Sequence, residues 1–205
     1  MNALQSIHLP YLFLENPFWA ALFLGSYFAY MRVIAWVNRK EHDQAGGADR
    51  DSGSRTVIYR LSLAGLGLAL AAPYLMPAAA ITLPHEPVFI VALLLLWSGT
   101  ILYPWSAATL GTFFRTQVML LDGQRLVTRG PYRILRHPAY TGGILVYAGF
   151  GLAMGNWLSF AAAPLLLLVA YRRRIDVEEA VLRERFGADF EAYRRRTWAL
   201  VPLLW

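Results

Sequence analysis

The chain alternates between long apolar runs and shorter polar, basic segments. Five apolar runs stand out, at residues 10–37, 57–80, 87–114, 139–154 and 157–171. A helix needs about 20 apolar residues to cross the hydrocarbon core of a bilayer. The last two runs are shorter and form a tight hairpin around Gly155 and Asn156, so we expect them to continue as helices beyond the membrane. The pattern predicts an all-α integral membrane protein with five transmembrane helices.

The basic residues divide the chain in the same way. All 19 lysines and arginines lie within residues 32–60, 115–136 and 172–196, and the intervening stretches contain none. Five crossings bring these three segments to one side, which the positive-inside rule makes cytoplasmic. We therefore expect the N-terminus outside and the C-terminus in the cytoplasm. The net charge of +6 then indicates membrane orientation and not a nucleic-acid surface.

Composition supports the membrane class. The chain of 205 residues is 57% hydrophobic, above the roughly 45–50% of soluble domains. It has no cysteine, which excludes disulfides, a thiol nucleophile and a thiolate metal site. No basic segment precedes the first apolar run, so that run is expected to stay in the membrane. Many arginines and alanines beside a single lysine favour a GC-rich prokaryotic genome and hence an inner membrane.

The sequence predicts two parts. Residues 1–114 hold three membrane helices and the polar, glycine-rich stretch 39–56, which we expect to be a mobile cytoplasmic loop. Residues 115–205 hold most of the candidate chemistry. From Leu182 to Tyr193, apolar residues recur every three or four positions, which is typical of an amphipathic helix. We expect this C-terminal helix to run on from the fifth crossing and to fold against the cytoplasmic loop before the fourth.

The densest polar segment stands directly before the fourth apolar run. Residues 126–143 read LVTRGPYRILRHPAYTGG. Pro138 suits the first turn of a helix, where its missing N–H costs nothing, so the helix is expected to start at about His137. A helix start beside arginines attracts an anion. Across the hairpin, Arg174 and Glu178 are four positions apart and can pair on one helix face.

These features predict a pocket at the cytoplasmic boundary of the membrane. Such a pocket could hold a polar, partly charged cofactor while an apolar substrate enters from the lipid. The adjacent Glu179 is expected to pair instead with Arg183 on the helix surface, again at a spacing of four.

The quoted stretch, followed by EEAVLRERFGADFEAY and a final W-x-L-V-P, resembles the isoprenylcysteine carboxyl methyltransferase family, which is related to the phospholipid methyltransferases. The likeness covers about residues 105–205. It implies S-adenosylmethionine as cofactor and methyl transfer at the cytoplasmic membrane face. It also implies a lipophilic or lipidated substrate that enters from the bilayer, with membrane lipids as the other partners.

The resemblance further implies the residues of the site. Arg174 matches the arginine that contacts the substrate, and with Glu178 it forms the candidate catalytic pair, with no metal. The prenylcysteine branch of the family has a histidine at the position of Gln124. This difference concerns the identity of the substrate and not the cofactor. The implied cofactor contacts are Gln117, Gln124, Arg125, Leu126, Val127, Tyr132, His137, Pro138, Ala139, Tyr140 and Glu178.

The chemistry of these residues agrees with the implied cofactor. S-adenosylmethionine carries a carboxylate, which the helix start and His137 suit, and an ammonium, which Glu178 suits. Tyr132 or Tyr140 could face its adenine or sulfonium. Purely structural roles stay open as well, with His137 as a helix cap and the two tyrosines as membrane-boundary aromatics.

Three enzyme classes and one structural class are compatible with the sequence. Methylation of a lipophilic carboxylate, such as a prenylcysteine-like carboxyl group, needs placement and exclusion of water but no base, and Arg174 would orient the anionic acceptor. Phospholipid N-methylation needs a carboxylate near the methyl group, either Glu178 or Glu179, and Arg174 would repel the amine. A nicotinamide-dependent membrane reductase of the sterol type has a similar arginine-histidine-proline stretch. The structural class is a non-enzymatic membrane scaffold, which would not explain why these cofactor-like site residues occur together.

Overall fold

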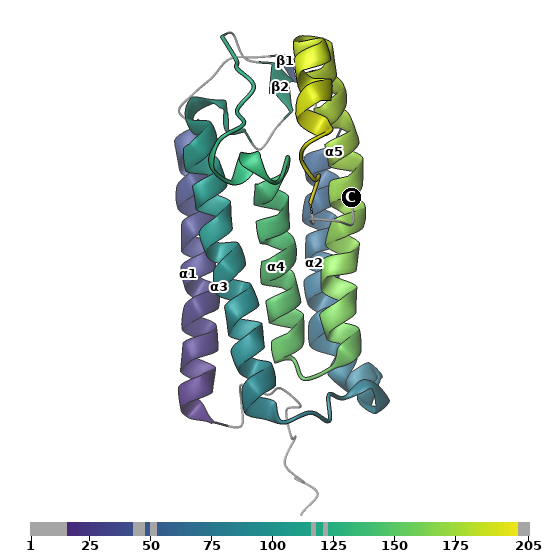
Figure 1. Cartoon of the computed structure of the whole chain (residues 1–205). Coiled ribbons are helices and arrows are strands. Elements are labelled where there is room, and N and C mark those ends of the chain that lie inside the picture. Colours follow the sequence, from purple (N-terminus) through teal and green to yellow (C-terminus); the bar gives the residue numbers. More distant parts are fainter. Residues whose placement is uncertain (1–15, 43–47, 50–52, 116–117, 121–122, 201–205) are drawn as a thin grey trace, which may run out of the picture.

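The computed structural model describes residues 16–42, 48–49, 53–115, 118–120 and 123–200. Within these residues five long helices lie side by side and form an elongated bundle (Figure 1). The helices are α1 (Pro17–His42), α2 (Ser54–Leu75), α3 (His85–Leu110), α4 (Pro138–Ala153) and α5 (Trp157–Arg194).

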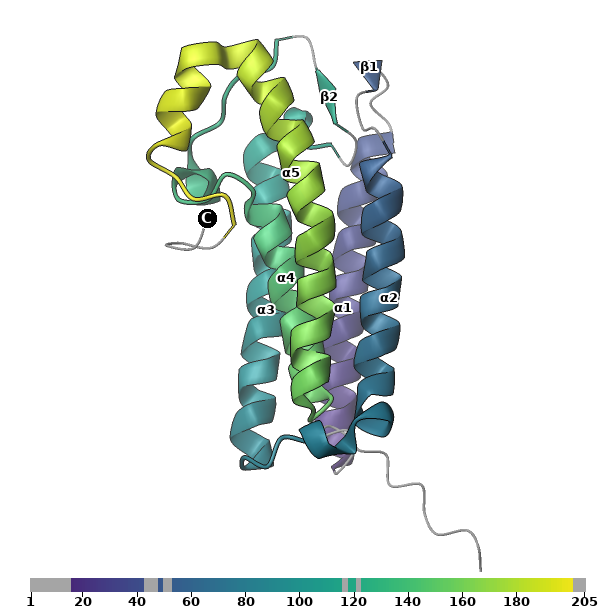
Figure 2. The same ribbon diagram turned by 90° about the vertical axis from the view of Figure 1, so that its right-hand side faces the viewer.

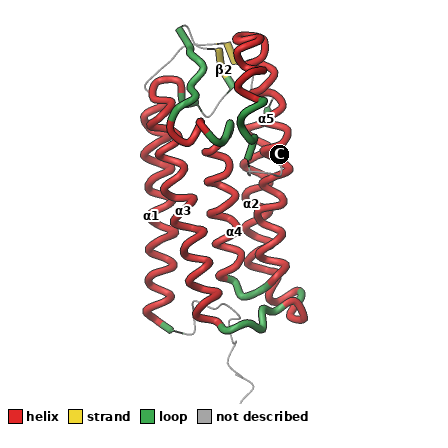
Figure 3. Tube along the Cα trace, viewed as in Figure 1, coloured by secondary structure: helices red, strands yellow, loops and turns green. Residues whose placement is uncertain are grey.

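Short elements close the two ends of the bundle (Figure 3). A two-residue antiparallel pair, in which Ala48 is opposite Leu120, is the whole sheet content of the described residues. The short elements are the 3₁₀ turns η2 (Pro77–Ala79), η3 (Gly111–Phe113) and η4 (Gly130–Arg133), and the strands β1 (Ala48–Asp49) and β2 (Met119–Leu120).

The predicted apolar runs correspond to the five helices, with shifted ends. The shift matters most at the predicted loop 39–56, because α1 continues to His42 and α2 begins at Ser54. The loop is therefore shorter than expected at both ends. Basic residues in the last turn of a helix are favoured by its dipole, which explains why Arg39 and Lys40 extend α1 beyond the apolar run. Residues 43–47 and 50–52 of that loop lie outside the described residues.

Helices α3 and α4 pack against each other through glycines. A Cβ added at Gly99 would meet the carbonyl oxygen of Gly142 and would lie 2.9 Å from the backbone nitrogen of Val146. On the other side of the bundle, α2 packs on α5, where a Cβ at Gly65 would lie 3.3 Å from the Cα of Ala163. Small residues let helix backbones approach closely, as is common between membrane helices.

The outer surface of the bundle carries many large apolar side chains. Phe28, Leu94 and Val169 are 68%, 62% and 63% exposed, respectively. Large contiguous apolar surfaces on a protein mark contacts with other molecules or with lipid. Three described segments are long and apolar enough to cross a membrane: Pro17–Arg39, Ser54–Leu75 and His85–Phe113. The structure therefore supports an all-helical membrane protein.

The crossing of the membrane by α4 and α5 stays a prediction. Helix α4 has 16 residues, and the apolar part of α5 ends at Tyr171, before three consecutive arginines. The division of the chain into two parts at residue 114 also stays a prediction.

Helix α5 runs on past the fifth apolar run, as expected, but it consists of two helical parts that meet at Gly187. It bends at Gly187, whose φ of +49° lies in the left-handed region that favours glycine. After this bend the helix turns back over the end of the bundle (Figure 2). The chain then passes beside the start of α4, where the N–H of Trp198 donates to the carbonyl oxygen of Ile134 over 3.0 Å. The last five residues, 201–205, lie outside the described residues.

Candidate active site

The structure contains a cavity of about 290 Å³ at the end of the bundle where α4 begins. Its walls come from residues 124–127, from η4, from the start of α4 and from α5. These elements bring together most of the residues that the sequence singled out. Those that line the cavity are Gln124, Arg125, Leu126, Val127, Tyr132, His137, Ala139, Tyr140, Arg174 and Glu178.

One expected site residue is not in the cavity wall, and another is not among the described residues. Pro138 is buried at the first turn of α4 and is not among the residues that line the cavity. Gln117 lies outside the described residues. The roles expected of all these residues stay predictions.

Glu178 stands at the centre of the polar wall. The hydroxyl of Tyr140 donates to its Oε1 atom, and the Nε of Arg174 donates to the same oxygen over 2.8 Å. The Nδ1 of His137 lies 3.3 Å from Oε2. The predicted pairing of Arg174 with Glu178 is therefore present. Burial would raise the pKa of the Glu178 carboxyl, but His137, Arg174 and Tyr140 together lower it to about 2.

His137 is held between two carboxylates. Its Nε2 lies 3.3 Å from Oε1 of Glu179, so both ring nitrogens face glutamates. The ring is also stacked parallel to that of Tyr140, with centroids 5.6 Å apart, and Tyr140 stacks on Tyr171 at 4.5 Å. Burial disfavours the charged imidazole, yet the hydrogen bonds and charges of Glu178 and Glu179 raise the pKa of His137 above its usual 6.5. His137 therefore lies between the two glutamates, which both favour its charged form.

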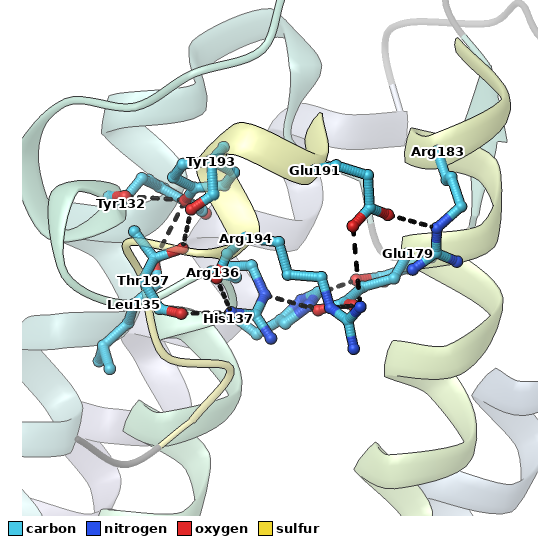
Figure 4. A network of polar contacts seen from close by, with 11 residues as sticks. Tyr132, Leu135, Arg136, His137, Glu179, Arg183, Glu191, Tyr193, Arg194 and Thr197 are labelled. Atoms are coloured by element: carbon cyan, nitrogen blue, oxygen red, sulfur yellow. Dashed lines mark hydrogen bonds and ion pairs between the residues drawn. The ribbon is translucent and has the colours of Figure 1, made fainter. Parts of the chain in front are cut away.

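The expected surface pairing of Glu179 with Arg183 is wrong. The Glu179 side chain is 9% exposed, and its Oε1 accepts a hydrogen bond from the Nε of Arg136 over 2.7 Å (Figure 4). Its Oε2 lies 3.5 Å from the Nε of Arg194. Burial again opposes ionisation, but His137 and Arg136 lower the pKa of Glu179 to about 2. Glu179 therefore ties α5 to the segment before α4.

Arg183 pairs across the bend in α5 instead. Its Nε donates to Oε1 of Glu191 over 2.7 Å, and both side chains are exposed (Figure 4). The left-handed backbone at Gly187 redirects the helix, so that Glu191 comes back to Arg183. A straight helix, which the spacing of four assumes, would not bring these two side chains together.

The C-terminal helix contacts η4 in the loop before α4, against which it was expected to fold. The hydroxyl of Tyr193 donates to the carbonyl oxygen of Tyr132 over 2.7 Å, and both residues line the cavity together with Phe190. Tyr193 and Phe190 belong to the predicted apolar stripe, so the sequence indicated a buried face. It also indicated the loop that covers this face, but not that the contact is made at η4.

The start of α4 is also covered by the C-terminal segment. The backbone N–H groups of Arg136 and His137 donate to the carbonyl oxygens of Trp198 and Ala199 over 2.7 and 3.0 Å. The Thr141 hydroxyl donates to the carbonyl oxygen of Leu200. The final W-x-L-V-P motif of the sequence therefore begins beside His137.

Two N–H groups at the start of α4 already have acceptors within the chain, and anion binding by this helix start stays a prediction. The N–H groups of Tyr140 and Thr141 donate to the carbonyl oxygen of His137 over 3.1 and 3.2 Å. Arginine side chains in the cavity wall, among them Arg125 and Arg55, are further candidates for an anionic group.

The remaining wall of the cavity is mostly apolar. The end of α3 and the turn η3 contribute Leu110 and Phe113, and α5 contributes Val181 and Leu182. A cavity with one carboxylate, several guanidinium groups, tyrosine rings and apolar side chains fits a ligand that carries both charges and an aromatic ring. The amino acid and adenosine parts of S-adenosylmethionine have these groups.

Comparisons with known proteins agree with this geometry. The sequence model of the family described as phospholipid methyltransferase matches residues 87–189. The chain is 32% identical over 117 residues to a probable protein-S-isoprenylcysteine O-methyltransferase of Oryza sativa, with 56% of this chain and 61% of that protein covered. It is 32% identical over 109 residues to the protein-S-isoprenylcysteine O-methyltransferase of Schizosaccharomyces pombe, with 46% of each covered. The chain thus spans less than two thirds of these relatives.

A solved structure shares the fold. The eukaryotic intramembrane Ras methyltransferase, isoprenylcysteine carboxyl methyltransferase, superposes with a TM-score of 0.59 at 20% identity. The superposition covers 98% of this chain and 70% of the other. The relatives and the fold confirm the predicted likeness to the isoprenylcysteine carboxyl methyltransferases. Since the family model matches half of the chain, the chain belongs to the phospholipid methyltransferase family.

Proposed function

We propose that the chain is an S-adenosylmethionine-dependent integral membrane methyltransferase that methylates a lipophilic acceptor. The observation that carries the proposal is the cluster of Tyr140, Arg174 and Glu178 on the wall of one cavity. Family membership and the shared fold support the same activity.

The cavity wall offers a partner for each part of the cofactor. Glu178, with a pKa of about 2, is ionised at neutral pH and suits the cofactor's ammonium or a ribose hydroxyl. Arg125, beside Leu126 and Val127, suits its carboxylate. Tyr132 can pack against the adenine, and burial raises the pKa of its phenol so that it stays neutral. When bound, the cofactor supplies an electrophilic methyl group on a sulfonium.

The electrostatics of the cluster favour a carboxylate as acceptor. An amine acceptor must lose a proton, and the two residues that could take it are Glu178 and Glu179. Both have a pKa of about 2, which makes them weak bases. A carboxylate acceptor needs no base, and Arg174 can orient it by charge. We therefore favour methylation of a prenylcysteine-like carboxyl group over phospholipid N-methylation.

The arrangement in the membrane is part of the proposal. All three basic segments meet at the end of the bundle that contains the cavity, where α4 begins and α5 carries its arginines (Figure 1). Five crossings with this end in the cytoplasm satisfy the positive-inside rule. The site would then face the cytoplasm, and an acceptor would reach it from the inner membrane of a prokaryote. The exposed apolar side chains of α3 and α5 support lipid contact along the bundle.

Thermal unfolding of the purified protein in detergent tests the cofactor. S-adenosylhomocysteine should raise the midpoint, since a ligand that binds only the folded state stabilises it, and NADPH should not. The opposite result favours the reductase. Transfer of a labelled methyl group to an N-acetylated prenylcysteine, compared with its methyl ester and with phosphatidylethanolamine, then tests the acceptor. If only phosphatidylethanolamine were labelled, the acceptor would be an amine and not the proposed carboxylate.

A further inference from the structure

The first residue of α2 reaches the candidate active site. Ser54 is 1% exposed, and its hydroxyl oxygen accepts a hydrogen bond from a terminal nitrogen of Arg174 over 2.8 Å. Arg55 and Ile58, which follow on α2, line the cavity. We propose that Ser54 is a positioning residue that holds the Arg174 guanidinium in the orientation that an anionic acceptor requires. This inference rests on the proposed function.

The guanidinium of Arg174 is held at two separate points. Its Nε donates to Oε1 of Glu178 over 2.8 Å and contacts the hydroxyl of Tyr140 at 3.2 Å. A terminal nitrogen is held by Ser54. The group is planar and its donors form a rigid fork, so anchors at Nε and at a terminal nitrogen fix both its tilt and its rotation. Loss of the Ser54 contact would remove one of the interactions that fix this orientation.

Burial makes the second anchor important. The Arg174 side chain is 1% exposed, and a buried cation is tolerated only when its donors find acceptors. Replacing Ser54 by alanine would remove one acceptor of this buried cation. The cavity lies beside it, because Arg174 lines the cavity. The guanidinium would then shift relative to any acceptor bound there.

Helix packing holds Ser54 beside Arg174. Gly53 adopts a φ of +74°, which turns the chain into α2. Further along the interface, the hydroxyl of Ser159 on α5 donates to the carbonyl oxygen of Ala69 on α2 over 2.7 Å. The contact between Ser54 and Arg174 is therefore one end of an extensive α2–α5 interface. A serine at the other end of this interface provides a matched control.

The test compares Ser54→Ala with Ser159→Ala. Each removes one buried hydroxyl that links α2 and α5, but only the first removes an anchor of Arg174. With the prenylcysteine acceptor, kcat of Ser54→Ala should fall about tenfold to a hundredfold, as for loss of a hydrogen bond to a charged group. The Kd for S-adenosylhomocysteine should stay within about twofold, because Ser54 does not line the cavity. Ser159→Ala should keep its kcat, and Ser54→Thr, which restores a hydroxyl, should recover most of the loss.

A second variant guards against a folding defect. Ser54→Cys keeps the shape of serine with a somewhat larger atom at its end, but it supplies only a weak acceptor, so it should lose kcat like Ser54→Ala. The wild-type chain has no cysteine, so the new thiol is unique and its burial can be checked by labelling. Wild-type kcat in both variants, or an equal loss in Ser159→Ala, would overturn the inference and leave the proposed function intact. A wild-type protein that neither binds S-adenosylhomocysteine nor transfers methyl would instead overturn the proposed function.

Discussion

The Nε of Arg174 lies 2.8 Å from Oε1 of Glu178, one helical turn further along α5, and Arg174 is the more buried of the two side chains. A salt bridge of this kind contributes little net stability, because removing both charges from water offsets their attraction. Its value lies in holding the guanidinium and the carboxylate in fixed positions on the cavity wall. The pair is therefore better understood as part of the binding site than as a support of the fold.

Replacing Arg174 by alanine should separate acceptor chemistry from cofactor binding. We expect turnover with a carboxylate acceptor to fall about a hundredfold, the usual effect of removing one group that orients or stabilises the reacting charge. The Kd for S-adenosylhomocysteine should change by less than about threefold. Steady-state kinetics and calorimetric titration measure the two quantities.

The neighbouring Arg173 supplies the control for Arg174→Ala. It is exposed and does not line the cavity, so Arg173→Ala should keep both activity and cofactor affinity. If Arg174→Ala lost turnover and cofactor affinity to the same extent, the assignment of Arg174 to the acceptor would be wrong.

Glu179 should matter more for stability than any exposed glutamate. Glu179→Gln keeps the size of the side chain but leaves the Arg136 guanidinium, 7% exposed, without its charged partner. Breaking a buried pair in this way costs about 3 kcal/mol of unfolding free energy. Chemical unfolding followed by tryptophan fluorescence measures the loss.

Glu191→Gln is the matched comparison for Glu179→Gln. It also removes one charge from an arginine pair of the same network, but both Glu191 and Arg183 are exposed (Figure 4). Water and salt screen such pairs, so the unfolding curve of Glu191→Gln should stay close to that of the wild type. Equal destabilisation by both substitutions would contradict a buried, structural role for Glu179.

The pH dependence of stability should reflect the titration of His137 and of the two glutamates beside it. The pKa of His137 is raised on folding, so its contribution is full below pH 6.5 and is lost as the pH rises through the higher folded value. The pKa values of Glu178 and Glu179 are lowered to about 2, so their contribution is full above pH 4.5 and is lost as the pH falls towards 2. Both contributions are complete between about pH 4.5 and 6.5.

Thermal unfolding midpoints from pH 4 to pH 9 test this dependence. The wild-type midpoint should fall on the alkaline side, and His137→Gln should flatten that fall. His85, an exposed histidine at the start of α3, supplies the control, and His85→Gln should keep the wild-type slope. Parallel curves for the wild type and His137→Gln above pH 6.5 would show that the imidazole is not held as a cation.

The sequence predicted those features that depend on local spacing. Apolar runs predicted the helices, Pro138 located the start of α4, and the spacing of four residues predicted the contact between Arg174 and Glu178. Each of these depends on residues within one or two helical turns. Local patterns of this kind can be recognised without knowing how the helices pack.

The features that were missed depend on packing between distant segments. The contact of Ser54 with Arg174 spans 120 positions and exists only because α2 packs on α5. The burial of Glu179 depends on the bend at Gly187, and a glycine within a helical pattern is compatible with a straight helix as well as a bent one. Spacing within one helix therefore assigned Glu179 the wrong partner, Arg183.

The orientation of the bundle in the membrane can be tested with single cysteines, since the wild-type chain has none. Arg133 in η4 and Thr82 before α3 are exposed and lie at opposite ends of the bundle. If the basic end is cytoplasmic, Thr82→Cys should react with a membrane-impermeant maleimide in intact spheroplasts. Arg133→Cys should react only after the membrane is permeabilised. The unsubstituted chain should show no labelling in either condition, and labelling of Arg133→Cys in intact spheroplasts would reverse the proposed orientation and move the cavity to the outer face.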